Sequence, residues 1–512
     1  MKTKLFIVLM ILGLVFTSCE DWLKVNSETE LSQDDMFSSD EGFHTALTGV
    51  YIGMTATDLY GMHLSWHMLD YLAHYYCLIS GSNDTYLHSH QYKHTRVYPY
   101  IKGTWNGLYN LIANCNNILA KLEEHKSELN PINYQLVKGE ALTLRAFFHF
   151  DLMRMFGFGN LRNRDVSSKK AIPYVTTFSK EVTPQLSYSE TFELLKKDLL
   201  EAIDLLYGEN GKNCYRITGD DDFFDNGPNG EDHAFFTYFD YQTSPRVDYY
   251  VAKAILARVY MWEGSDEGYA KAAEIAEEWF LTEDDSGQDC WDWVSRSRVT
   301  NSNVLYRDRT FSQEHIWHLS VTKLNDIIGN WLDASNPNAT YERIFLTQEM
   351  AFSIFEVGEG NDVGVNDYRY SYLLQPQGSG LNNYATLKLD QCNGETNYGQ
   401  KIPLISTPEM YYICAEVYAQ QGNLKKAISY LNTVRRARGI TADLDENLTY
   451  QEVREEILKE YRKEFVSLGQ LFYFYKRWGV ESVAGYADIM DDTKYVLPYP
   501  DEEVISGNRV QF

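Results

Sequence analysis

The sequence predicts a mostly α-helical protein in which helical hairpins form a scaffold and one long, loop-rich insertion carries short strands. The first observation is that apolar residues recur at helical spacing in four stretches, at residues 102–157, 187–206, 247–280 and 406–438. The second is that two of these stretches, 247–280 and 406–438, contain an alanine, a tyrosine and a glycine at the same offsets from one another. The third is that the helical periodicity ends between residues 281 and 401. We therefore expect about four helix pairs around a separate loop-rich region.

The chain begins with a short apolar stretch that is typical of a secretory signal. Two lysines precede an apolar run from Leu5 to Phe16. This run is too short to cross a bilayer, which takes about 20 helical residues. It ends in Phe16-Thr17-Ser18-Cys19, which resembles a bacterial lipobox. We expect a lipoprotein signal peptide at residues 1–18 and lipidation of Cys19, which then anchors the mature chain to a membrane.

The first half of the mature chain predicts three long helices. The first carries an apolar stripe that begins at Trp105. The second starts at Asn130-Pro131, a helix-start signal, and stops at Gly157. The third begins with Ser187 and Glu190, which have the spacing of a capping box.

Two later segments have the pattern of helix, glycine turn and helix. The shared offsets are those of Ala257, Tyr260 and Gly264 in one segment and of Ala415, Tyr418 and Gly422 in the other. This pattern is typical of tetratricopeptide units. Because such units stack by burying each other's faces, the two hairpins need the helices at 102–157 and 187–206 to complete the scaffold.

The C-terminal hundred residues contain two more predicted capping boxes, Ser406 to Glu409 and Thr449 to Glu452. The second opens a helix with one continuous apolar stripe, formed by Val453, Ile457, Tyr461, Phe465 and Leu468. Such a stripe must pack on another element.

The insertion at about 281–401 is rich in Gly, Asn, Asp and aromatic residues, with candidate strands at Glu314 to Leu319 and Tyr384 to Leu389. A stretch of this length without regular structure is usually functional or disordered. Its aromatic content argues against disorder. We expect this region to bind a ligand.

The C-terminal residues resemble the SusD/RagB family of outer-membrane nutrient-binding lipoproteins, whose pattern is similar to R-x-E-F-x-x-E-G-Q-R-x-x-D-L-x-R-W. The matching residues are Arg462, Glu464, Phe465, Gly469, Gln470, Arg477 and Trp478. The chain departs from the pattern at Leu468, Leu471 and Phe474, where Glu, Arg and Asp are usual. We interpret the loss of two opposite charges at 471 and 474 as apolar packing in place of an ion pair.

This resemblance extends to Ala46–Tyr51, Arg145–Gly157 and the closing Leu497–Pro500. It implies one SusD/RagB-like domain at residues 19–512, held on the outer membrane by lipid and facing the exterior. It also implies capture of an oligosaccharide and delivery to a partner TonB-dependent β-barrel transporter of the SusC-like type. Two alternatives stay open: the same fold binding peptides, and a tetratricopeptide scaffold that binds only proteins.

Composition and motifs argue against other classes. A net charge of −26 repels phosphate backbones and so argues against nucleic-acid binding. The sequence lacks HExxH, GxSxG and Walker motifs. We expect no catalytic residues, no cofactor and no enzyme activity, with a glycosidase as the remaining alternative, because two suitably placed carboxylates cannot be recognised in a linear sequence.

Aromatic residues in predicted loops are the candidate ligand contacts, because a sugar ring stacks its C–H face on an exposed aromatic ring. The candidates are Trp66, Tyr75, Tyr76, Trp291, Trp293, Trp317 and Trp331. Core packing is the alternative role for each of them.

The histidines, acidic residues and cysteines complete no recognised pattern for a metal site or a disulfide framework. His63 and His67 have the spacing of metal ligands on a helix, but no cysteine or carboxylate completes the set, so no metal site is predicted. The acidic loop from Asp220 to Asp232 offers oxygen ligands for calcium but does not fit an EF-hand. The six cysteines other than Cys19 predict no obligatory disulfide framework.

Overall fold

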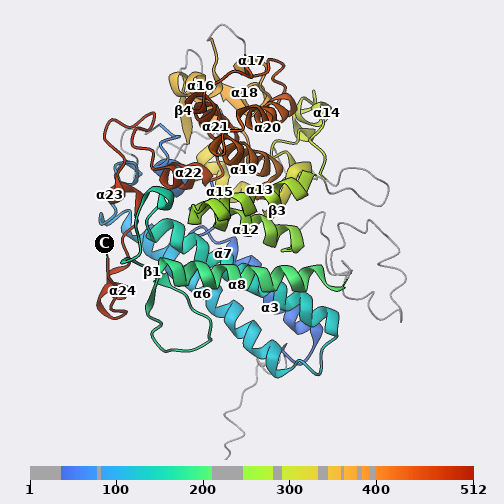
Figure 1. Ribbon diagram of the computed structural model, residues 1–512, viewed down its shortest axis with the longest axis vertical. Helices are drawn as coiled ribbons and strands as arrows, with labels where there is room; N and C mark the ends of the chain where they lie inside the picture. Colours follow the sequence, from blue (N-terminus) through green and yellow to red (C-terminus); the bar gives the residue numbers. More distant parts are fainter. Residues whose placement is uncertain are drawn as a thin grey trace, which may run out of the picture.

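The computed structural model describes residues 36–77, 82, 84–209, 246–280, 291–332, 344–358, 363–376, 383–390 and 398–511. Figure 1 shows a helical body, with the early helices at one end, and the insertion together with the C-terminal hairpin at the other.

Eight helices of the described chain form a continuous series in which each helix packs on the next. They are α6 (Tyr98–Glu124), α7 (Pro131–Phe156), α8 (Tyr188–Tyr207), α12 (Tyr249–Glu263), α13 (Asp266–Phe280), α19 (Thr407–Gln420), α20 (Leu424–Ala437) and α21 (Tyr450–Glu464). α8 packs on both α7 and α12, and α13 packs on α19, so the two isolated hairpins are joined as the sequence predicts. The tetratricopeptide-like scaffold of about four helix pairs is confirmed.

The glycine turns of the two hairpins have the same backbone conformation. Gly264 and Gly422 have φ of +78° and +81°, a left-handed region that glycine enters without steric cost. At Gly264 a Cβ atom would also lie 2.9 Å from the backbone nitrogen of Arg162. This close approach explains why the repeat spacing ends on glycine in the first hairpin.

Of the three predicted capping boxes, two form and one does not. Ser187 and Thr449 each accept a hydrogen bond from the backbone N–H three residues later, and the glutamates at those positions reach back, so both capping boxes form. Ser406, which ends a strand and pairs with His315, makes no side-chain cap. The predicted capping box there is wrong, since Glu409 instead receives two hydrogen bonds of 2.6 Å from Arg258.

The insertion contains more regular structure than the sequence predicts. Its elements are α14 (Arg296–Val299), η3 (Val304–Tyr306), η4 (Ser312–Glu314), β3 (His315–Ser320), α15 (Leu324–Leu332), β4 (Phe345–Thr347), α16 (Gln348–Phe355), α17 (Val363–Asn366), α18 (Tyr368–Ser371), β5 (Leu374–Pro376), β6 (Asn383–Thr386) and β7 (Lys401–Ser406). β3 pairs antiparallel with β7, and β6 lies between β4 and β5 in an antiparallel sheet. The two predicted strands correspond to β3 and to a shorter β6.

The remaining elements lie outside the series of eight helices and the insertion. They are α3 (Asp40–Met54), α4 (Met68–Leu72), α5 (Thr85–His88), η1 (Leu161–Asn163), the antiparallel pair β1 (Lys170–Pro173) and β2 (Gln185–Ser187), α22 (Gln470–Trp478), α23 (Asp492–Tyr495) and α24 (Asp501–Ile505). None of the described helices combines the length and the apolar composition that a bilayer span requires. The cysteines in the described segments, Cys77, Cys115 and Cys414, form no disulfide with one another, and Cys19 lies outside those segments.

The C-terminal residues that depart from the family pattern are buried. Leu468, Leu471 and Phe474 expose 4%, 1% and 3% of their surface, and the Phe474 ring stacks on Tyr461 with centroids 3.9 Å apart. Apolar packing therefore does occupy these positions. Arg477 instead forms a pair of hydrogen bonds, 2.5 and 2.6 Å, with Glu416 on α19.

Candidate functional site

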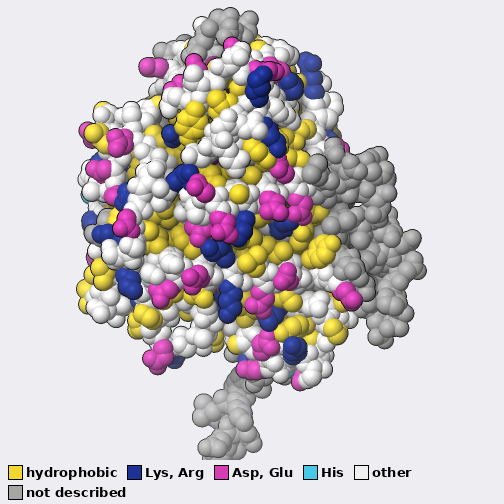
Figure 2. Space-filling view, in the orientation of Figure 1, with side chains coloured by type: hydrophobic (Ala, Val, Ile, Leu, Met, Phe, Trp, Pro, Cys, Tyr) yellow, Lys and Arg dark blue, Asp and Glu magenta, His cyan; other side chains and the backbone are white. Residues whose placement is uncertain are grey.

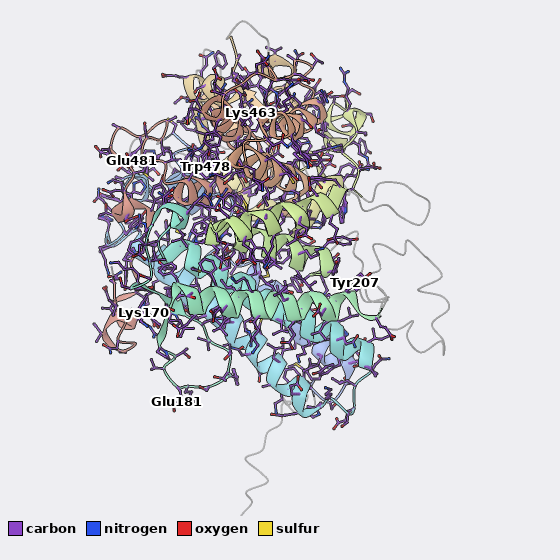
Figure 3. All side chains as sticks on the ribbon, viewed as in Figure 1. Lys170, Glu181, Tyr207, Lys463, Trp478 and Glu481 are labelled. Atoms are coloured by element: carbon purple, nitrogen blue, oxygen red, sulfur yellow. The ribbon has the colours of Figure 1, made fainter. Side chains whose placement is uncertain are left out.

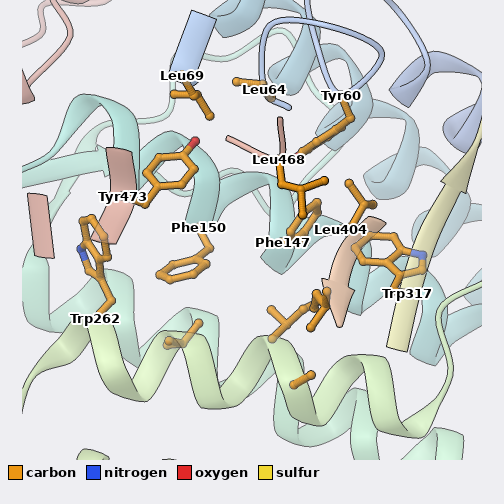
Figure 4. Packing of buried hydrophobic residues seen from close by; sticks show 14 of the residues in the cluster. Tyr60, Leu64, Leu69, Phe147, Phe150, Trp262, Trp317, Leu404, Leu468 and Tyr473 are labelled. Atoms are coloured by element: carbon orange, nitrogen blue, oxygen red, sulfur yellow. The ribbon is translucent and has the colours of Figure 1, made fainter. Parts of the chain in front are cut away.

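Four of the predicted ligand aromatics belong to the core. Trp317 is fully buried beside Phe147, with ring centroids 4.9 Å apart, as Figure 4 shows. Trp66, Tyr75 and Tyr76 are also buried, each exposing no more than 2% of its surface. A sugar ring needs an exposed aromatic face, so the assignment of Trp66, Tyr75 and Trp317 to ligand contact is corrected to core packing. The sequence could not separate the two roles, because aromatic residues serve both.

The other three predicted aromatics are half-buried and lie in different places. Trp331 packs against His67 of the early segment, with centroids 4.6 Å apart. Trp291 stacks at 3.7 Å on Trp279 of α13. Trp293 lies 5.1 Å from Tyr411 of α19. These residues do not form one ligand surface. They pack where the insertion contacts neighbouring segments. Ligand contact by their exposed edges stays a proposal.

The early histidines do not form a metal site. His63 and His67 are buried with ring centroids 5.4 Å apart, and their nearest carboxylates, Asp58 and Asp84, are different ones. Within the described segments no cluster of three His, Cys, Asp or Glu side chains could hold a metal ion. The acidic loop at Asp220–Asp232 lies outside those segments.

The candidate site is a pocket of ≈ 410 Å³ where the early segment meets the insertion and α21. Its lining comes from four parts of the chain: Tyr76, Cys77 and His88; Thr347, Glu349, Met350 and Ser353; Arg462; and Ala484 with Gly485. Of the seven predicted aromatics only Tyr76 lines it. Convergence of segments that are far apart in sequence explains why no linear motif indicated this pocket.

Backbone contacts fix the walls of the pocket. The N–H of Cys77 donates a 2.8 Å hydrogen bond to the carbonyl of Phe345 in β4. Thr347 caps α16 by accepting from the N–H of Met350, which holds that helix at the rim. Gly485 has φ of +86°, and a Cβ atom there would lie 2.6 Å from Cε of Met350. The loop at 484–485 thus lies directly against α16.

The polar side chains of the pocket include two charges without ion-pair partners in the described chain, Arg462 and Glu349. The backbone carbonyl of Arg462 accepts a 2.7 Å hydrogen bond from the hydroxyl of Tyr75. Tyr76 donates a 2.9 Å hydrogen bond to Asp70, and burial raises the pKa of that carboxyl group to about 8. These hydrogen bonds hold Tyr76 and the backbone of Arg462 in place. The charged side chains of Arg462 and Glu349 are available to a ligand.

A histidine cluster supports the same wall. Nδ1 of His74 lies 3.0 Å from Nε2 of His88, and the His74 ring stacks on Tyr486 at 4.2 Å. Burial, followed by the neighbouring histidines His88 and His90, lowers the pKa of His74 to about 2. These imidazoles are neutral at pH 7, so they can exchange hydrogen bonds with uncharged hydroxyl groups. The pocket combines such groups with the apolar side chains of Met350 and Ala484, as binding sites for small polar molecules do.

Sequence comparison shows what this chain is similar to. Residues 240–509 match the profile of the SusD family, and residues 21–218 match that of a family described as starch-binding, associating with outer membrane. No curated protein sequence matches the chain.

Solved structures share the fold across almost their whole length. A SusD superfamily protein from Bacteroides thetaiotaomicron has 19% identity and a TM-score of 0.67, covering 92% of this chain and 98% of its own. A putative sugar binding protein from Bacteroides vulgatus has 20% identity and a TM-score of 0.63, covering 91% and 96%. A SusD-like carbohydrate binding protein from the same species has 18% identity and a TM-score of 0.65, covering 92% and 97%. With one profile matched over more than half of its residues, and with the helical scaffold and C-terminal residues described above, this chain belongs to the SusD family.

Proposed function

We propose that this protein is a cell-surface lipoprotein that binds an oligosaccharide in the pocket between the early segment, α16 and Arg462. The observation that carries the proposal is this pocket of ≈ 410 Å³, which presents charged, hydroxyl and apolar groups together. A sugar has the same mixture of hydroxyl groups and C–H faces. The names of two structural neighbours, a sugar binding and a carbohydrate binding protein, support the same ligand class.

Binding without bond cleavage fits the rest of the chain. In this proposal residues 19–512 form one domain, tethered at the outer membrane through lipidated Cys19. The protein passes its cargo to a TonB-dependent transporter of the SusC-like type. A bound ligand can shift the protein from its capturing state to its delivering state only to the extent that it binds the delivering state more tightly. The description of the matched family as associating with outer membrane supports the location.

The experiment starts from the purified mature protein, with a glycan array and a peptide pool offered in parallel. We expect glycans to be retained and peptides not. Retention of peptides without glycans would refute glycan binding and show instead that this fold binds peptides. Hydrolysis of a retained glycan would favour the glycosidase, and binding of neither ligand class would favour a protein-interaction scaffold.

A matched pair of substitutions then tests the pocket. Ala484 is exposed and lines the pocket, so Ala484→Trp fills it without disturbing the core. Ala487→Trp, on the same exposed loop but outside the lining, is the control. By calorimetry we expect Ala484→Trp to weaken glycan binding about tenfold or more, a loss of about 1.4 kcal/mol, and Ala487→Trp to leave it unchanged. Equal affinities of the two variants would place the ligand elsewhere.

A further inference from the structure

A second pocket, of ≈ 160 Å³, lies between η1, α13, α19, α21 and α22 and shares no lining residue with the candidate site. Its lining includes three arginines, Arg162, Arg454 and Arg477, against one carboxylate, Glu416. This is a local excess of positive charge in a chain whose net charge is −26. The face in Figure 2 otherwise shows basic and acidic side chains interspersed.

Two of the three arginines are paired with carboxylates. Arg477 donates two hydrogen bonds to Glu416, which also accepts from Tyr269 and from Nε1 of Trp478, both at 2.9 Å. Arg162 donates to the carbonyl of Gly264 and to Asp266. Glu416, the only carboxylate in the pocket lining, is thus paired with Arg477 and makes no ion pair with Arg454 within the described residues.

Arg454 differs from the other two. Its guanidinium lies 4.5 Å from the ring centroid of Trp478 and 5.9 Å from that of Tyr450, and it makes no ion pair or hydrogen bond within the described chain. Figure 3 labels Trp478 on α22. Stacking on a ring holds the planar guanidinium in place while leaving its N–H fork available, the geometry that binds a carboxylate through two hydrogen bonds.

Amide side chains complete the lining. Asn160, Asn163 and Gln420 all face this pocket. The Tyr450 hydroxyl donates a 2.7 Å hydrogen bond to the side-chain oxygen of Gln420, which leaves the Gln420 amide N–H groups available as donors. Donors of this kind suit hydroxyl groups. A cavity of roughly 150 Å³ holds one benzene molecule, so this pocket of ≈ 160 Å³ can take no more than a single sugar unit.

We propose that this pocket is a second saccharide site, specific for a single uronic acid unit whose carboxylate binds Arg454 and whose hydroxyl groups bind the neighbouring amides. The proposal goes beyond the function proposed for the candidate site, since a neutral glycan could occupy that pocket while an acidic unit is held here.

Calorimetry with glucuronate, glucose and acetate tests the proposal on the mature protein. We expect glucuronate to bind about tenfold or more tightly than either of the others, because only it offers both the carboxylate and the hydroxyl groups. Added salt weakens the binding of glucuronate. Acetate binding as tightly as glucuronate would reduce the pocket to a simple anion site and overturn the proposal.

Variants locate the binding. Arg454→Gln lowers glucuronate affinity about tenfold or more, whereas Arg436→Gln, which removes a largely exposed arginine on α20 paired with Asp443, does not. Gln420→Leu weakens glucuronate but not acetate, a difference that general misfolding cannot produce. Unchanged glucuronate binding by Arg454→Gln would refute the site. Ala484→Trp leaves glucuronate binding intact, so failure of the candidate site and failure of this one are distinguishable.

Discussion

The guanidinium of Arg438 donates two hydrogen bonds to Glu464, at 2.9 and 3.0 Å, and two more to Glu314, at 2.6 and 2.9 Å. All three residues expose no more than 2% of their surface. Burial raises the pKa of Glu464, but Arg438, Lys388 and Arg369 outweigh that effect and lower the pKa to about 2. Because Arg438 follows α20, Glu464 ends α21 and Glu314 precedes β3, the contact ties the insertion to the helical stack.

Removing this guanidinium should strongly destabilise the fold. Arg438→Met leaves two carboxylates buried without their main partner, which costs about 3–5 kcal/mol. Arg436→Met, in an exposed pair with Asp443, is the matched control and costs about 0–1 kcal/mol. Urea unfolding of both variants measures the difference. Similar losses for the two would mean that the buried contact contributes no more than a surface ion pair.

Helix capping gives a second comparison. Thr449→Ala removes a side chain that accepts from the N–H of Glu452, so we expect a loss of about 0.5–2 kcal/mol in the free energy of unfolding. Ser406→Ala removes a residue of the same type that caps nothing, and its effect should stay below about 0.5 kcal/mol. Denaturant titration tests the order. A greater loss at Ser406 than at Thr449 would contradict the observed caps.

These two residues also show how far the sequence predicts the fold. The hydroxyl-to-glutamate spacing predicts a capping box at both, and the periodicity predicts both helices correctly. The sequence cannot show that Ser406 ends a strand paired with His315, a residue 91 positions earlier, or that Glu409 is drawn to Arg258. Local signals therefore predict the helices, whereas long-range pairing decides what their first residues do.

The candidate site was less predictable for the same reason. Trp317 and Trp331 both lie in the insertion, yet one is fully buried in the core and the other is half-buried against His67. The residues that do line the pocket, such as Thr347 and Arg462, meet only after the insertion has packed on α21. The type of a residue alone does not predict which distant residues will line a pocket together with it.

In the proposed function, lipid anchoring depends on one cysteine, Cys19. In Cys19→Ser we expect the protein to leave the membrane fraction, because two or more acyl chains are needed for firm attachment. Mass spectrometry of the intact mature chain measures the lipid directly, and fractionation measures its effect. Cys77→Ser, at a partly exposed cysteine that forms no disulfide with the other described cysteines, is the control that stays with the membrane. An unmodified mature N-terminus, or membrane retention of Cys19→Ser, would refute lipid anchoring through Cys19.

Acid sensitivity should arise in part from His149 on α7. Its Nδ1 lies 2.8 Å from the carbonyl of Arg145, and its Nε2 lies 2.9 Å from the backbone nitrogen of Val175, so Nδ1 donates and Nε2 accepts. Burial has the largest effect on the pKa of His149 and lowers it; the backbone hydrogen bond to Arg145 raises it and the Arg145 charge lowers it, and the net pKa is about 3 instead of 6.5.

The unfolded chain therefore binds the proton first, and stability that is present above pH 6.5 is lost as the pH falls toward 3. At pH 5 this single residue should cost about 2 kcal/mol relative to pH 7.5. His149→Gln keeps a donor and an acceptor but cannot titrate, so urea unfolding at the two pH values should show a smaller decline for this variant, by about that amount. Parallel declines in the two proteins would show that His149 is protonated as easily in the folded state as in the unfolded chain, which the Val175 hydrogen bond to Nε2 does not allow.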